Sequence, residues 1–271
     1  MHWYTKEGRP LHEIEGANGE MRPTTLRDAR KLKLVPSVTT IMGIQDKPAL
    51  LTWTRDQILN AVLRVPRPLN TFDLVGCGHS MDEIAKIEQE QIDLWRFKVL
   101  AESQKFTQNA QAWGSRIHNA LEDVVKNNVI DNELLCITAP VIKFLESNFP
   151  DAEWVAEKSF CHNTGFGGCV DLHCPKTNIV LDFKTKKKSA EQMKKLRAYD
   201  DHHMQTASYT VGLGLPKDTK RYNLFIGYDV DEGGDLLFTD LKLTESTDFE
   251  REWNMFKKLL EFWQLKNKYV P

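Results

Sequence analysis

The sequence predicts an α/β fold of the mixed α+β kind, in which helices flank a central mixed β-sheet and a helical extension precedes the sheet. Three observations predict this class. Strand-like runs follow one another closely between about residues 152 and 185. Helical patterns lie before and after these runs. A long helical stretch begins near residue 80, well before the first of the strands.

The first 110 residues are expected to form a mostly helical region that packs on the core. Residues 1–20 are compatible with a short polar hairpin. Ser80 with Glu83 resembles a capping box at the start of the long helix. Residues 66–80 have the composition of a loop. Threonine, serine or proline marks the expected helix starts, and the helices are expected over residues 24–33, 37–43, 48–65 and 80–111.

Residues 111–271 are expected to form the core, with the element order α-β-β-β-α-β. Ser246 or Thr247 is the expected cap of a last amphipathic helix that reaches Lys266. The other helices are expected around residues 112–126, 139–148 and 200–213, and the strands near 152–161, 167–174, 179–185, 221–230 and 235–243. This order of elements is compatible with a mixed sheet covered by helices.

Composition limits the classes of protein that the chain can represent. Its 271 residues suit one large domain, or one domain with an extension, and 41% hydrophobic residues suffice for a core. No apolar run approaches the roughly 20 residues that span a membrane, so no membrane partner is expected. Five irregularly spaced cysteines argue against a disulfide framework and for a reducing cytoplasm. Because the net charge is -2, nucleic-acid binding requires a local basic patch.

The most informative segment is a β-hairpin expected between residues 168 and 188, with its turn at residues 175–177. If Cys174 pairs with Ile179, antiparallel counting sets Asp171 opposite Asp182, and Lys184 shares their face because strand side chains alternate. Like charges directly opposite each other repel. A divalent cation between the two carboxylates makes such a pair favourable. The alternative is a solvated hairpin with scattered charges.

The pattern D…D-x-K formed by Asp171, Asp182 and Lys184 resembles that of the PD-(D/E)XK nuclease superfamily, and in particular its RecB-type, phage-like exonuclease branch. Further motifs extend the resemblance over about half of the chain. They are His118 in a helix upstream, Glu157 in the strand before the hairpin, Gly168, the pair Gln205 and Tyr209 with Q-x-x-x-Y spacing, and Pro36–Thr40 followed by Trp53.

The resemblance implies a metal-dependent active site that uses Mg²⁺ or Mn²⁺, with two ions expected. Asp171, Asp182 and the backbone carbonyl of Phe183 are the expected ligands of one ion. Lys184 is expected to orient or deprotonate the attacking water, or to stabilise the developing charge. His118 is the expected ligand of the second ion, although a lone histidine on an amphipathic helix is more often a packing residue.

Glu157 is expected to be a catalytic ligand of metal or water if its strand is in register with Asp171; otherwise it is a surface glutamate. Gln205 and Tyr209 lie four residues apart on one helix face, and the resemblance implies that they contact the DNA backbone. Alternatively, they are polar residues at the rim of the core. The basic run from residue 184 to 197 is expected to bind phosphates or to be a solvated loop, and the expected DNA-binding lysines are Lys186, Lys187 and Lys188.

Two other metal centres are not expected. Cys161–His162 and His173–Cys174 suggest a Cys₂His₂ zinc site, but adjacent residues in a strand point to opposite faces, so we expect no zinc. The five cysteines do not match the terminal grouping of the iron–sulfur cluster found in some RecB-type relatives, so no cluster is expected.

The expected function is a metal-dependent DNA exonuclease that hydrolyses phosphodiester bonds in recombination, repair or phage DNA processing. The preference for DNA ends comes from the resemblance alone. The expected partners are linear DNA and a single-strand annealing protein, and the expected location is the cytoplasm of a bacterial or phage-infected cell. A structure-specific or restriction-like endonuclease and an inactive DNA-binding protein with the same fold are the alternatives. Cleavage polarity, strand preference and oligomeric state stay open.

Overall fold

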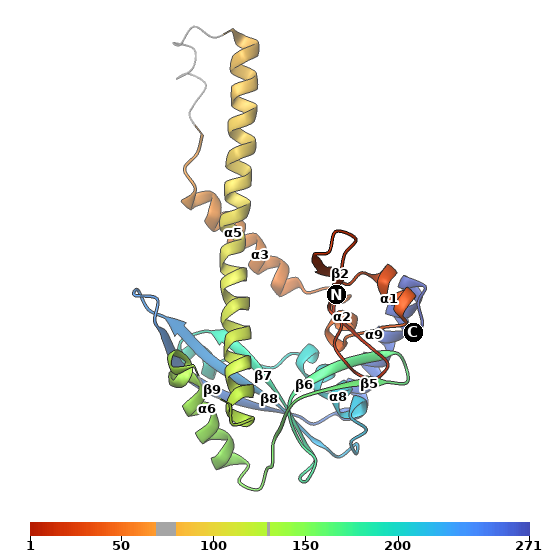
Figure 1. The fold of residues 1–271 in the computed structure, drawn as a ribbon. Helices are drawn as coiled ribbons and strands as arrows, with labels where there is room; N and C mark the ends of the chain where they lie inside the picture. The colour runs from red at the N-terminus through yellow and green to blue at the C-terminus, as the bar shows by residue number, and fades with distance from the viewer. Residues whose placement is uncertain (69–79, 129–130) are drawn as a thin grey trace. The chain divides into compact units, whose positions relative to one another are not determined.

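The computed structural model describes residues 1–68, 80–128 and 131–271 (Figure 1). The chain forms two compact units. One contains Met1–Gln45 together with Gly114–Pro271, and the other contains Asp46–Trp113. This division differs from the boundary expected at residue 110, because the first 45 residues belong with the sheet. The expected loop at residues 66–80 lies mostly outside the described residues.

The main sheet has the order β5-β6-β7-β8-β9 in the described part of the chain. The first three strands are antiparallel neighbours, β7 and β8 are parallel, and β8 and β9 are antiparallel. This mixed sheet with flanking helices confirms the predicted fold class. The strands are β5 (Val155–His162), β6 (Phe166–Cys174), β7 (Ile179–Lys187), β8 (Lys220–Val230) and β9 (Leu236–Ser246).

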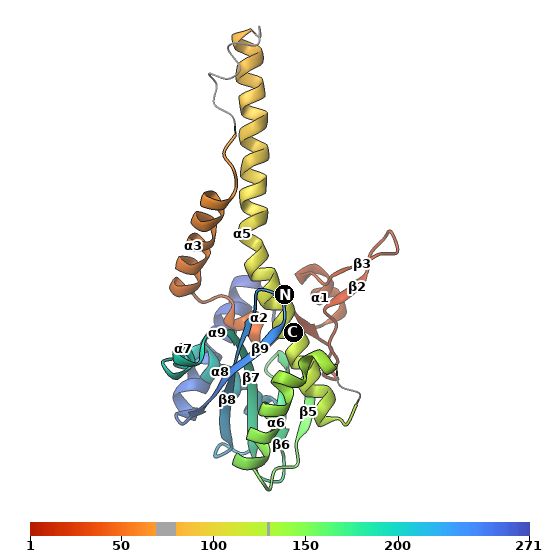
Figure 2. The same cartoon turned by 90° about the vertical axis from the view of Figure 1, so that its left-hand side faces the viewer.

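The chain forms two helices between β7 and β8, because parallel neighbouring strands need a crossover connection. The crossover contains α7 (Ala190–Lys194) and α8 (Asp200–Gly212), of which α8 packs against β5, β6, β7 and β8 (Figures 1 and 2). α6 (Leu135–Asn148) packs against β9, and α9 (Phe249–Asn267) packs against α8. The short helix α7 is absent from the sequence prediction, since its five residues lie in a lysine-rich run that suggested a loop.

The N-terminal segment is held by buried contacts with the sheet unit. β1 (Trp3–Tyr4) pairs with β4 (Val35–Pro36), and β2 (Glu13–Glu15) pairs with β3 (Met21–Pro23). The hairpin expected within residues 1–20 is present in part, because Tyr4 and Pro10 form an antiparallel bridge and the Leu11 N–H donates to the carbonyl of Trp3 at 2.8 Å. The expected second strand then continues into a further pairing, that of β2 with β3. Trp3 is fully buried, and its indole N–H donates to the carbonyl of Thr24 at 3.0 Å. Burial of this large side chain explains why the segment joins the core.

The helices of the first 125 residues begin at the predicted caps. Thr25 forms a capping box with Asp28, and Ser37 caps the following helix. Ser80 and Glu83 exchange hydrogen bonds at the start of the long helix, which continues without interruption to Val125. The helices are α1 (Leu26–Leu32), α2 (Val38–Met42), α3 (Pro48–Arg64) and α5 (Met81–Val125). No helix among the described residues is long and apolar enough to cross a bilayer.

Two helix starts in the second half differ from the prediction. Asp248 caps α9 in place of Ser246 or Thr247, because Ser246 pairs with Arg221 at the end of β9. α6 begins at Leu135, after a 3-10 turn over Asn132–Leu134, and not at residue 139.

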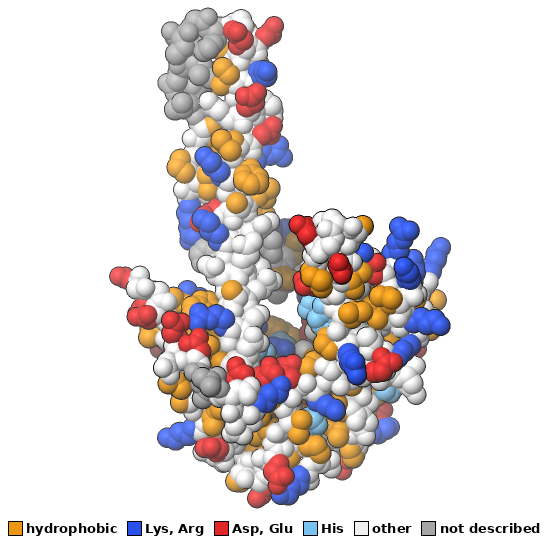
Figure 3. All heavy atoms as spheres, viewed as in Figure 1, with side chains coloured by type: hydrophobic (Ala, Val, Ile, Leu, Met, Phe, Trp, Pro, Cys, Tyr) orange, Lys and Arg blue, Asp and Glu red, His pale blue; other side chains and the backbone are white. Residues whose placement is uncertain are grey.

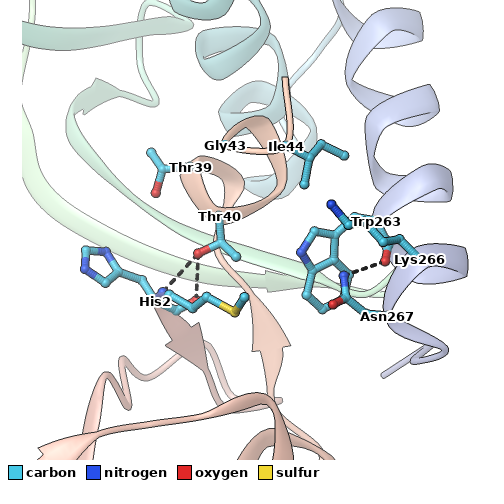
Figure 4. Close-up of a pocket in the computed structure, with 9 residues that line it drawn as sticks. His2, Thr39, Thr40, Gly43, Ile44, Trp263, Lys266 and Asn267 are labelled. Atoms are coloured by element: carbon cyan, nitrogen blue, oxygen red, sulfur yellow. Dashed lines mark hydrogen bonds between the residues drawn. The ribbon is translucent and has the colours of Figure 1, made fainter. Parts of the chain in front are cut away.

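A cavity of about 580 Å³ lies between the N-terminal segment and α9 (Figure 4). His2 donates its backbone N–H to Thr40 Oγ1 at 2.9 Å on one side, and Trp263 lies on the other. Lys266 is the charged side chain in its lining. None of the acidic residues of the hairpin lines this cavity.

Candidate active site

The hairpin formed by β6 and β7 has the predicted register. Cys174 pairs with Ile179, and the ladder continues to Leu172 and Leu181. It then stops, so the expected pairing of Asp171 with Asp182 is not part of it. The reason is that the Asp171 carboxylate takes the place of a backbone acceptor: its Oδ2 accepts the N–H of Phe183 at 2.6 Å. The two strands separate where the acidic residues begin.

Asp182 is the most deeply buried acidic residue of this region, with 1% of its surface exposed. The ammonium of Lys184 lies against Asp182 Oδ2, although this buried oxygen accepts no well-directed hydrogen bond. Burial raises the pKa of Asp182 to about 6, an effect that the charge of Lys184 opposes and the charge of Asp171 increases. Burying the Asp182 carboxylate close to Asp171 thus costs free energy unless a metal cation binds between the two aspartates.

His118 on α5 contacts the other aspartate. Its Nδ1 lies 3.6 Å from Asp171 Oδ2, and its ring stands edge-on to Phe183 at 6.0 Å between centroids. Burial alone lowers the pKa of His118, but the carboxylates of Asp171 and Asp182 outweigh it, so this pKa lies above its ordinary value. Burial alone raises the pKa of Asp171, but His118, Lys184 and the Phe183 N–H lower it below its ordinary value.

Glu157 on β5 lies at the register position opposite Asp171, between the pairs Ala156 with Leu172 and Lys158 with Val170. Its φ of 52° lies in the left-handed region, which is rare for a residue with a side chain and is typical of functional sites. Its Oε2 accepts a hydrogen bond from Cys169 Sγ at 2.8 Å. Burial, together with the charge of Asp171, raises the pKa of Glu157, while the Cys169 thiol opposes the rise.

Gln205 and Tyr209 lie on α8 and contact each other. The Gln205 amide donates to the Tyr209 hydroxyl at 2.6 Å, and both residues are buried. Burial raises the pKa of Tyr209 well above its ordinary value, and the charges of Asp182 and Asp171 add to this effect. The helix therefore carries this pair close to the acidic residues. Its expected contact with DNA stays a prediction.

The three expected DNA-binding lysines differ in their surroundings. Lys187 is exposed and lies 3.6 Å from a carboxylate oxygen of Asp229. Lys186 and Lys188 are half-buried and line a common pocket. Burial lowers the pKa of Lys186, as do the neighbouring charges of Lys184 and Lys188. On the face in Figure 3, basic and acidic side chains are interspersed, so binding of phosphates requires a local cluster of basic residues.

The acidic site includes residues that sequence reasoning missed. Cys169 stands two residues before Asp171, a spacing that places both on one strand face, and this was the available signal. Asn223 pairs with Asp182 in the parallel register of β7 and β8, and its buried amide has no hydrogen-bond partner. No local sequence signal identifies Asn223, because the pairing of β7 with β8 joins segments about forty residues apart.

The donor atoms of the site suit a hard divalent cation. Among the described residues, no three histidine, cysteine or acidic side chains already meet in metal-binding geometry. Nevertheless, Asp182 Oδ2 is buried without a hydrogen bond, and the carboxylate of Asp171 influences its ionisation. Carboxylate and carbonyl oxygens are the ligands that Mg²⁺ and Mn²⁺ prefer, so the residues present fit such an ion.

Comparison with known proteins finds distant structural likenesses. No family model matches the sequence, and no curated protein matches it. A phage-related exonuclease from Haemophilus somnus 129PT is similar in structure with a TM-score of 0.34 and 12% identity, over 55% of this chain and 80% of that one. The protein SSO0001 is similar with a TM-score of 0.29 and 15% identity, over 80% of this chain and 87% of that one. TM-scores this low assign no fold family.

Proposed function

We propose that this protein is a metal-dependent nuclease that hydrolyses phosphodiester bonds of DNA, and more specifically an exonuclease. The observation that carries the proposal is the buried pair of aspartates at the point where β6 and β7 separate, with Lys184 directly beside Asp182. A purely structural sheet gains nothing from burying an aspartate whose pKa rises to about 6. Such perturbed groups are concentrated at functional sites.

Asp171, Asp182 and the carbonyl oxygen of Phe183 would hold a divalent cation. The carbonyl is included because the N–H and C=O of a strand residue point to the same side, and the Phe183 N–H points at Asp171. When bound, Mg²⁺ or Mn²⁺ lowers the pKa of a coordinated water and neutralises charge on the phosphate. His118 would contribute its ring to a second ion.

Lys184 is the residue that would act on the attacking water. Its ammonium lies in the site, and its side chain is 21% exposed, so that water reaches it. In that position, it would donate a hydrogen bond that orients the water, or stabilise negative charge on the phosphoryl oxygen. Glu157, held by the Cys169 thiol, would accept a proton from water, because burial raises its pKa above the ordinary value and so makes its carboxylate a stronger base.

The proposed substrate is DNA with free ends, and the proposed setting is recombination, repair or phage DNA processing in the cytoplasm, with a single-strand annealing protein as partner. An endonuclease would use the same residues. An inactive DNA-binding protein would not require Asp171, Asp182 and Lys184 together. The free-energy cost of burying Asp182 supports the enzyme over the inactive binding protein, because binding alone does not need this residue.

A nuclease assay on two DNA topologies tests the proposal. Purified protein is incubated with end-labelled linear duplex and with closed circular DNA, in Mg²⁺, Mn²⁺ or EDTA. An exonuclease degrades the linear DNA only, and EDTA stops the reaction. Cleavage of the circular DNA would show that the protein is an endonuclease and not an exonuclease. Intact DNA of both kinds with either metal would favour the binding protein.

A further inference from the structure

A basic pocket of about 450 Å³ is lined in part by Lys186 and Lys188, which follow Lys184 of the acidic site along the chain. Seven of the residues that line it are basic or aromatic and carry the argument that follows: Lys186, Lys188, Lys195, Arg197, Tyr199, His202 and Phe225. No acidic residue is part of its lining. The pocket therefore has the charge that attracts a phosphate.

The pocket and the acidic site are both lined by residues of β7. Lys186 follows Lys184 by two residues, which corresponds to about 6.6 Å along a strand. Phe225, which also lines the pocket, pairs with Lys184 in the register of β7 and β8. A strand of nucleic acid with one phosphate at the acidic pair would consequently bring a neighbouring nucleotide to the pocket.

The pocket's lysines and arginine are not neutralised from within the described part of the chain. Neither Lys186 nor Lys188 forms an ion pair there, whereas Lys187, which lies between them, is paired with Asp229. Lys195 and Arg197 are exposed and likewise have no carboxylate partner in the described residues. Four cations without a counter-charge in one pocket are suited to an anionic ligand.

An exposed aromatic ring accompanies these cations. Tyr199 is 67% exposed at the start of α8, and its ring centroid lies 5.8 Å from that of His202. His202 in turn stands edge-on to Phe225 at 5.2 Å. His202 thus lies between the rings of Tyr199 and Phe225 in this chain of contacts, while most of the surface of Tyr199 faces solvent. An exposed ring beside cations is the combination with which proteins bind single-stranded nucleic acid.

We propose that this pocket binds one unpaired nucleotide of the substrate strand, next to the phosphate that is cleaved. The lysines and Arg197 hold its phosphate, and its base stacks on Tyr199. A base inside a duplex already stacks on its neighbours and does not offer a free face to a side chain. The pocket thus selects strands whose end is unpaired. This inference rests on the proposed nuclease function and specifies its substrate.

Binding measured without cleavage tests the pocket separately from the chemistry. Fluorescence anisotropy in EDTA compares a labelled single strand with a blunt duplex of equal length, using the full chain. Tyr199→Ala is expected to weaken single-strand binding about tenfold, because one stacked base is lost, and to change duplex binding little. Tyr199→Phe keeps the ring and is expected to bind as the original protein does. Phe262→Ala removes another exposed ring, 55% exposed on α9, and serves as the matched control.

Salt dependence gives a second readout. Arg197→Gln is expected to reduce the slope of log binding constant against log salt by about 0.7 for a single strand, the value for one phosphate contact. Unchanged single-strand binding by Tyr199→Ala, or an equal loss for the duplex, would overturn the proposal. If Tyr199→Ala weakens single-strand binding while the original protein cleaves nothing, the pocket stands and the nuclease function fails. If the original protein cleaves DNA and Tyr199→Ala binds the single strand as tightly as the original does, the nuclease function stands and the pocket proposal fails.

Discussion

Replacing Asp182 by asparagine is predicted to stabilise the protein at neutral pH while abolishing its activity. The pKa of Asp182 rises from 3.8 to about 6 in the folded protein. Between these values the folded state holds a proton that the unfolded state has lost, so stability falls as pH rises through this window. About two pKa units correspond to about 3 kcal/mol of lost stability above pH 6.

Asparagine carries no charge and avoids this cost. The difference in unfolding free energy between Asp182→Asn and the original protein is expected to be close to zero near pH 4 and to grow to about 3 kcal/mol near pH 8. For a chain of this size, that corresponds to a rise of roughly 6–12 °C in melting temperature. Asp171 does not cancel the trend, because its pKa is lowered and it titrates below this window.

Thermal unfolding in EDTA, followed by circular dichroism at pH 4 and at pH 8, measures the effect. Asp229→Asn is the matched control: Asp229 is half exposed and pairs with Lys187 at the surface, so its replacement is expected to change stability by less than about 0.5 kcal/mol. The electrostatic reasoning would be refuted if Asp182→Asn were less stable than the original protein at pH 8. It would also be refuted if the two proteins differed in melting temperature by the same amount at pH 4 and at pH 8.

Two further substitutions test other parts of the site, and a third tests the packing of α8. Lys184→Ala is expected to reduce cleavage by about a hundredfold or more, while DNA binding in EDTA persists; loss of binding would show that Lys184 only holds the substrate. Cys169→Ala removes the hydrogen-bond donor to Glu157 and is expected to lower cleavage and shift its pH profile, with Cys169→Ser restoring both; an unaltered profile contradicts the role of the thiol. Gly212→Ala would place a methyl group 2.0 Å from the ring of Phe160, so a loss of roughly 1–3 kcal/mol is expected on thermal unfolding, and an unchanged melting temperature contradicts the packing.

Local chemistry made the register of the hairpin that carries the candidate site predictable. The turn at residues 175–177 and the alternation of side chains set the register of the hairpin, and the structure confirms it from Cys174 to Leu172. Side-chain caps similarly predicted where the N-terminal helices begin, as at Ser37. These features depend on residues close together in the sequence, where turn and cap chemistry decide the conformation.

Features that depend on distant segments were not predictable. The separation of β6 from β7 arises because the Asp171 carboxylate competes for the Phe183 N–H, a choice that no strand pattern records. The left-handed conformation of Glu157 is likewise set by its neighbours, since glutamate has no preference for it. Trp3 docks the first 45 residues on the sheet through burial, and the polar composition of the segment around it suggested a separate hairpin.

The most direct test of the central claim compares three proteins on one substrate. End-labelled linear DNA is incubated with the original protein, Asp182→Asn and Asp229→Asn, each with Mn²⁺ and with EDTA. If the acidic pair is the hydrolytic centre, the original protein and Asp229→Asn release labelled products with Mn²⁺ only, and Asp182→Asn releases none. Cleavage by folded Asp182→Asn at the rate of the original protein, or cleavage that persists in EDTA, would contradict the claim.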